Sequence, residues 1–213
     1  MGNPVREWAM RFLRPAREPE MVAIFLRQEF ARPERYGEAL GAALEATGAT
    51  SALINNPDLT DPNANRLRGQ VLAVYRGYGT GQPSYLTGFP VSNVAWSWVA
   101  LAPNEVLESR LIRYLATDEL VAGSRSPRKV AGRIRRGDVQ GEFADRIRDL
   151  AGQLKQGLSV DPVIVVSADG GHTRVVLEGN TRILAWALAP ETLAAETEVL
   201  LGVSPAIATW DEY

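Results

Sequence analysis

The chain has 213 residues, 46% of them hydrophobic and 23% charged, which is ordinary for a soluble globular protein that can bury a substantial core. It contains no cysteine and one histidine, and this excludes disulfides, thiolate zinc sites, a cysteine nucleophile and a multi-histidine metal site. The formal net charge of −2 gives the whole molecule no general attraction for nucleic acid, so any basic surface has to be local.

The first half of the chain is predicted to be helical. Residues 18–31 and 34–48 space their apolar side chains three and four apart, and Gly48 can end the second helix. Turn-forming residues fill 55–65, a further helix is expected over 64–79, and 80–90 is expected to be loop. In this half, the stretch from Tyr75 to Gly79 either reaches over a pocket or packs between the two parts of the chain.

From about residue 93 strands and helices alternate. The expected elements are a strand at 94–102, helices at 103–116, 124–137 and 143–157, a hairpin at 161–179, a helix from Asn180 and a strand at 197–204. These elements predict an α/β fold in two parts, a helical N-terminal extension (1–90) and an α/β core (91–213). No apolar run approaches the ~20 residues of a membrane span, and the first twenty residues lack an apolar signal segment. We therefore expect a cytoplasmic protein.

The segment Glu-Gly-Asn-Thr-Arg joins the second strand of the hairpin to the helix that follows. A helix N-terminus offers unpaired backbone N–H groups, glycine lets a ligand approach the backbone, and arginine adds a charged bidentate contact. Gly179, Asn180, Thr181 and Arg182 are therefore predicted to hold phosphate oxygens. The alternative is that Gly179 only makes the turn and Arg182 is a solvated surface residue.

The order of these elements around Gly157, Asp-Pro-Val-Ile-Val-Val and Arg-Val-Val-Leu-Glu-Gly-Asn-Thr-Arg resembles the core of the ParB/sulfiredoxin-like superfamily. The resemblance covers about residues 140–203, and 93–136 more loosely. It implies a small mixed sheet of that type with helices. It also implies that the loop-to-helix junction binds the phosphates of a nucleotide.

The resemblance separates the subfamilies. Sulfiredoxins have a cysteine in this loop, where the chain has Asn180 and Thr181. Chromosome-partitioning members have a second loop arginine and a DNA-reading helix-turn-helix downstream, for which the residues up to Tyr213 leave no room. The free-serine kinases place an acid before the loop glycine, as Glu178 does here, but they carry loop histidines that this chain lacks. The chain is therefore closer to the small-molecule kinase type.

The expected function is that of a nucleotide-dependent phosphotransferase or nucleotide hydrolase acting on a small molecule, with ATP or another nucleotide and Mg²⁺. Glu178 is the expected general base or metal ligand. The kinases also use a glutamate after the first strand of the core, where Glu105 or Glu108 could lie, and Glu105 is the second choice. A structural salt bridge from Glu178 to Arg174 or Arg182 is the alternative role. A non-catalytic nucleotide- or DNA-binding regulator is the alternative function, and a nuclease is a third.

A second basic cluster lies in residues 124–137. Arg125 and Arg128 belong to a Ser-Arg-Ser-Pro-Arg loop, and we expect them to line the same pocket as Gly179 and to contact phosphate or substrate. The alternative is a solvated basic helix face. A nucleic-acid partner for this cluster is not favoured, because the sequence pI is near 5.6.

Overall fold

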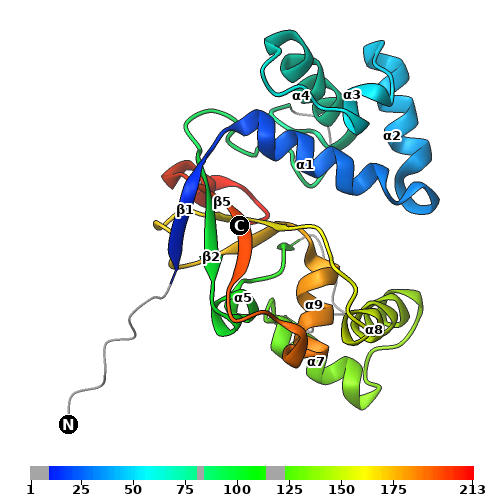
Figure 1. Cartoon of the computed structure of the whole chain (residues 1–213), viewed down its shortest axis with the longest axis vertical. Coiled ribbons are helices and arrows are strands. Elements are labelled where there is room, and N and C mark those ends of the chain that lie inside the picture. The colour runs from blue at the N-terminus through cyan, green and yellow to red at the C-terminus, as the bar shows by residue number, and fades with distance from the viewer. Residues whose placement is uncertain (1–9, 81–83, 114–122) are drawn as a thin grey trace.

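The computed structural model describes residues 10–80, 84–113 and 123–213. Its centre is a five-stranded mixed sheet in the order β1-β2-β5-β3-β4 (Figure 1). The strands are β1 (Arg11–Ala16), β2 (Ala95–Leu101), β3 (Val163–Ser167), β4 (Val175–Glu178) and β5 (Thr197–Val203). β3 and β5 run parallel, and the other neighbouring pairs are antiparallel. The expected α/β fold class is confirmed.

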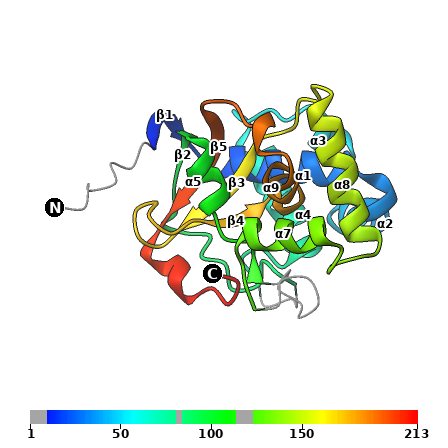
Figure 2. The ribbon, with the colours of Figure 1, turned by 90° about the horizontal axis from the view of Figure 1, so that it is seen from below.

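Helices cover both faces of the sheet (Figures 1 and 2). One face carries α1 (Glu18–Phe30), α2 (Pro33–Thr47), α3 (Ala52–Asn55) and α4 (Pro62–Arg76). The other carries α5 (Pro103–Glu108), α7 (Pro127–Arg136), α8 (Glu142–Lys155) and α9 (Asn180–Leu188). The short 3-10 helices η2 (Pro190–Thr192) and η3 (Pro205–Thr209) lie on either side of β5 in the chain.

Alternate residues of the strands contribute to two hydrophobic cores. In β3, Ile164 and Val166 pack on the side of α1 to α4, whereas Val163 and Val165 pack on the side of α5 to α9. Successive side chains of a strand point to opposite faces, so the continuous apolar run of β3 is buried on both sides. The N-terminal helices are thus the cover of one face of the sheet.

Most of the expected elements are confirmed at nearly the expected bounds. The hairpin of β3 and β4 forms as expected, and α9 begins at Asn180. Gly48 ends α2 with a φ of 68°, in the left-handed conformation that glycine adopts without strain. The turn-rich stretch at 55–65 is shorter than expected, because α4 already begins at Pro62 with the Asp61 side chain as its N-cap. Of the loop expected at 80–90, residues 81–83 lie outside the described part.

The prediction that the first half of the chain is helical is wrong at Arg11–Ala16, which form the edge strand β1. β1 pairs antiparallel with β2, and its register shifts between Phe12 and Arg14. An edge strand has one unpaired side, so Pro15 is tolerated there and no strong apolar alternation is needed. The boundary expected between residues 90 and 91 therefore falls between two strands that pair in one sheet.

The helix expected over 103–116 is also wrong in its length, because α5 ends at Glu108. Ser109 is extended, and Arg110 forms a parallel bridge with Val175 on the outer side of β4. Residues 114–116 of the expected helix lie outside the described residues. Within the described ranges, none of the helices combines the length and the apolar character needed to cross a bilayer.

Candidate functional site

The β4–α9 junction is built around Gly179. Its φ of 106° is unfavourable for any other residue, and a Cβ there would lie 3.0 Å from both Arg182 Nη2 and Val163 Cγ2. No side chain in the described part of the chain caps α9. The first amides of the helix, at Asn180 and Thr181, have no partner within the helix. The backbone N–H groups that the predicted phosphate site requires are therefore present at this junction.

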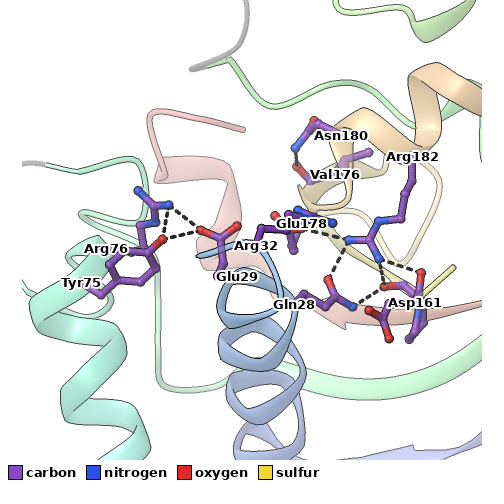
Figure 3. Close-up of polar contacts among 11 residues, drawn as sticks. Gln28, Glu29, Arg32, Tyr75, Arg76, Asp161, Val176, Glu178, Asn180 and Arg182 are labelled. Atoms are coloured by element: carbon purple, nitrogen blue, oxygen red, sulfur yellow. Dashed lines mark hydrogen bonds and ion pairs between the residues drawn. The ribbon is translucent and has the colours of Figure 1, made fainter. Parts of the chain in front are cut away.

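Arg182 is buried beneath this junction, with 2% of its surface exposed. Its Nη1 donates to the carbonyl oxygens of Asp161 at 2.7 Å and Pro162 at 2.9 Å. Its Nη2 donates to Gln28 Oε1 at 2.7 Å and Glu178 Oε1 at 2.9 Å (Figure 3). The alternative that Arg182 is a solvated surface residue is wrong. The guanidinium instead joins α1, the start of β3 and the end of β4.

Glu178 ends β4 and forms the ion pair with Arg182 that was one of its expected alternative roles. Arg32 Nη1 lies 3.5 Å from the same oxygen, Oε1. Arg174, the other expected partner, donates to the carbonyls of Gly171 and Glu105. Burial lowers the pKa of Arg182, and the charge of Glu178 opposes this effect. The pair therefore holds a buried cation in its charged form.

A pocket of about 310 Å³ lies between this junction and the helices α1, α2 and α4. Its charged lining residues are Glu29, Arg32, Arg35, Arg76, Glu178 and Arg182. Its aromatic lining residues are Tyr36, Tyr75, Tyr85 and Phe143. Four arginines and two glutamates give this lining a formal charge of +2, whereas the whole chain carries −2. The pocket is therefore electrostatically suited to an anion.

The structure brings four of the predicted phosphate ligands to this pocket. Gly179, Asn180, Thr181 and Arg182 all line it, together with Glu178. Besides lining the pocket, the side chain of Asn180 connects the junction to the segment that follows α5. Its Oδ1 accepts from the Ile112 amide at 3.1 Å. The expected junction is thus a wall of the pocket rather than an isolated turn.

Glu29 of α1 was not found from the sequence. It is 1% exposed, and its Oε2 accepts hydrogen bonds from the Tyr75 hydroxyl, at 2.7 Å, and from Arg76 Nη2. Burial raises the pKa of Glu29, and the charge of Glu178 raises it further. The available signal was that Glu29 follows the buried Phe25 by four residues, on the same face of an apolar helix.

Tyr75 and Arg76 do reach the pocket from the helical half. The Arg76 guanidinium carbon lies 4.0 Å from the ring centre of Tyr75, 5.1 Å from that of Tyr36 and 5.2 Å from that of Tyr85. Burial, and then the charge of Glu29, raise the pKa of Tyr36 to about 12. At neutral pH its hydroxyl group is therefore protonated and can donate.

Glu105 lies elsewhere. It is buried in the first turn of α5, and its Oε2 accepts a hydrogen bond of 2.9 Å from the Ala102 amide. This is a helix-capping interaction at the N-terminus of α5. Glu105 does not belong to the pocket that the described residues form. The structure therefore gives it a structural role.

Arg125 and Arg128 are not brought to the pocket as its described residues form it, so the expectation that they line it with Gly179 is not supported. Arg125 donates to the carbonyl oxygens of Leu111 at 2.7 Å, Glu212 at 3.0 Å and Tyr213. Burial and the neighbouring arginines lower the pKa of Arg125 to about 10. Arg128 is exposed and donates to Asn104 Oδ1 at 2.7 Å. Arg125 thus anchors the last described residues of the chain.

The described residues offer few side chains that could hold a metal ion. In the ranges 10–80, 84–113 and 123–213 no group of three or more His, Cys, Asp or Glu side chains could hold a metal ion. Glu29 and Glu178 are the two acids of the pocket, and arginines contact both. Mg²⁺ is commonly bound through one or two carboxylates together with substrate phosphates. A single carboxylate at the junction, that of Glu178, could take part in such a site only if a bound phosphate ligand supplied further oxygens.

Neither a family model, nor a curated protein, nor a solved structure matches this chain. The resemblance to the ParB/sulfiredoxin-like superfamily therefore stays a prediction.

Proposed function

We propose that the chain binds a nucleotide in this pocket and acts on its phosphates, as a nucleotide-dependent phosphotransferase or nucleotide hydrolase acting on a small molecule. The observation that carries the proposal is that a net positive lining and a helix N-terminus, which no described side chain caps, meet in one pocket. Helix N-termini bind phosphate through their amides, and arginines bind it through charge-assisted hydrogen bonds. The volume of about 310 Å³ is at the lower end of small-ligand sites, about 300–1,000 Å³.

The phosphate contacts are assigned to the amides of Asn180 and Thr181 and to Arg35. Arg35 is exposed, and its guanidinium lies 4.8 Å from the ring centre of Tyr36. Among the described residues it has no carboxylate partner, so its charge is available to a ligand. The guanidinium of Arg182 is already bonded on both Nη atoms, and its role is to hold Glu178 and the junction in place. Tyrosine rings of the lining supply apolar surface for a nucleobase.

Glu178 is the general base of this proposal. Both of its cationic neighbours contact Oε1, and Oε2 accepts no hydrogen bond from a described residue. That oxygen can take the proton of an attacking water or hydroxyl group. Mg²⁺ entering with the nucleotide would neutralise the charge of its phosphates. Glu178, beside the helix N-terminus, is the side chain that would meet it.

Calorimetry with nucleoside mono-, di- and triphosphates, each with and without Mg²⁺, tests the proposal, with orthophosphate and pyrophosphate separating phosphate from nucleotide recognition. Arg35→Gln should weaken binding by about 1.5–3 kcal/mol, the scale of hydrogen bonds to charged groups. Arg128→Gln, an exposed arginine outside the pocket, is the matched control and should bind as the wild type does.

Two results would overturn the proposal. One is a wild-type protein that binds none of these ligands. The other is a loss of binding in Arg128→Gln with normal binding in Arg35→Gln, which would move the phosphates to the basic cluster of residues 124–137. Duplex DNA binding that weakens steeply with salt, without nucleotide binding, would support the regulator instead.

A further inference from the structure

We propose that Glu29 is a second catalytic residue of this pocket, a proton donor that works opposite Glu178. The inference rests on the proposed function and narrows its substrate class. A base alone is enough when a good leaving group departs, whereas a proton donor is needed when the leaving oxygen is a basic alkoxide. The pocket is thereby assigned to phosphate esters of alcohols, such as a nucleoside monophosphate, with hydrolysis as the reaction.

The two carboxylates come from opposite walls of the pocket. Glu29 is presented by α1 and held by α4, whereas Glu178 is presented by β4 and held by α9. In the view of Figure 3, Glu29 lies between the Tyr75–Arg76 pair and the Glu178–Arg182 pair. Both line the same pocket, so one bound ligand can contact both.

The hydrogen bonds to Glu29 determine which of its oxygens carries the proton. Tyr75 and Arg76 both donate to Oε2, and an oxygen that accepts two hydrogen bonds is a poor place for a proton. Oε1 accepts no hydrogen bond from a described residue. The proton of a neutral Glu29 therefore sits on Oε1.

The surroundings of Glu29 raise its pKa above the ordinary glutamate value. The titratable and charged groups that face it are Arg32 on α1, Tyr36 on α2, Tyr75 and Arg76 on α4, Tyr85, and Glu178 on β4. Burial and the charge of Glu178 raise its pKa, while Arg76 and Tyr75 oppose this effect without cancelling it. Glu178 has two arginine neighbours, Arg32 and Arg182, whereas Glu29 has one, Arg76. Two carboxylates whose environments push their pKa values apart are a common arrangement for an acid and a base.

In the proposed reaction, Glu178 takes a proton from water while the water oxygen bonds to phosphorus. The bond from phosphorus to the ester oxygen breaks, and Glu29 gives its proton to that oxygen. The products are the alcohol and inorganic phosphate, with Glu178 protonated and Glu29 ionised. Exchange with solvent then returns one proton to Glu29 and removes one from Glu178.

Leaving-group dependence tests this role. Wild type and variants are compared on a nucleoside monophosphate and on p-nitrophenyl phosphate, whose phenolate departs without a proton. Glu29→Gln should lose about 10²-fold or more of its turnover on the nucleotide, the usual scale for an acid or base, and little on the phenyl ester. Glu18→Gln is the matched control, because Glu18 lies on the same helix and also accepts a tyrosine hydrogen bond, but does not line the pocket.

The outcomes separate the two proposals. Equal losses on both esters, or no loss on either, would remove Glu29 from the chemistry and leave the proposed function standing. A wild type that hydrolyses neither ester and binds no nucleotide would overturn the proposed function itself, and the proton donor with it.

A second measurement needs no turnover. In a carbon NMR titration of the glutamate carboxyl groups, the Glu29 signal is identified by its loss in Glu29→Gln, or by its displacement in Glu29→Asp if the first variant does not fold. Its midpoint should lie above the ordinary glutamate value and should fall in Glu178→Gln, where the neighbouring charge is gone. An ordinary midpoint in the wild type would refute the proton donor.

Discussion

The guanidinium Nη2 of Arg182 donates a hydrogen bond of 2.7 Å to Oε1 of Gln28, although the two residues are 154 positions apart in the chain. Gln28 also donates from Nε2 to the carbonyl of Pro162 at 2.8 Å. The buried side-chain amide of Gln28 on α1 therefore bonds both the guanidinium of Arg182 on α9 and the carbonyl of Pro162, just before β3. The helices of one sheet face are joined here to the loop that forms the pocket wall.

Gln28→Ala should destabilise the protein by about 1–3 kcal/mol, because it leaves one buried N–H group of Arg182 without a partner. It also removes one of the two hydrogen bonds that the carbonyl of Pro162 accepts, the other being from Arg182. Urea denaturation measures the loss. Gln153→Ala, at an exposed position of α8, is the control and should stay within about 0.5 kcal/mol of the wild type. Equal stability of the two variants would show that the Gln28 contact contributes nothing.

Glu178→Gln should lower turnover by about 10²-fold or more while nucleotide binding is kept, because it removes the charge that accepts the proton. It should also destabilise the fold, since Arg182 loses its buried counter-ion. Gln28→Ala supplies the comparison, because it destabilises the same cluster without removing a carboxylate. If both variants lose turnover in proportion to their stability, Glu178 has only a structural role.

Gly179→Ala should lower the free energy of unfolding by about 1–3 kcal/mol. Alanine is strained at a φ of 106°, and its Cβ would lie 3.0 Å from atoms of Arg182 and Val163. Gly152→Ala is the matched control, since that glycine lies inside α8 with nothing within 4 Å of the added Cβ. It should stabilise by about 0.5–1 kcal/mol. Thermal unfolding of the two variants should therefore move in opposite directions.

Glu29 should make the stability of the protein depend on pH. Its pKa is raised in the folded state, so its contribution to stability is complete below the ordinary glutamate pKa and is lost as the pH rises through the raised value. The difference in unfolding free energy between wild type and Glu29→Gln should therefore fall across that window. The fall amounts to about 1.4 kcal/mol for each pH unit between the two pKa values. Urea denaturation at a series of pH values measures it, and a flat difference would contradict the prediction.

The parts of the fold that were predicted correctly have local signals. α1 and α2 have apolar residues at helical spacing, and β3 is a short apolar run beside a turn of two glycines. The junction at Gly179 was found for the same reason, since a strand, a glycine and a helix follow one another directly. Such signals need no knowledge of the partner segment.

The parts that were missed depend on distant contacts. β1 is a strand only because β2 pairs with it, and Arg110 is extended because it bridges to β4. Glu29 lines the pocket only because α1 packs across from Glu178. Arg125 lies outside the pocket and donates a hydrogen bond to the carbonyl of Tyr213. No window of the sequence contains both members of any of these pairs.

The pairing of β1 with β2 also constrains the order in which the protein can fold. During synthesis α1 to α4 leave the ribosome before β2, β3 and β5, the strands against which their apolar sides pack. Contacts between segments so far apart form slowly, because a long loop of chain must first close. The nascent helices therefore carry uncovered apolar surface for many seconds, at synthesis rates of about 5–20 residues per second. Until the strands follow, this surface is of the kind that promotes aggregation.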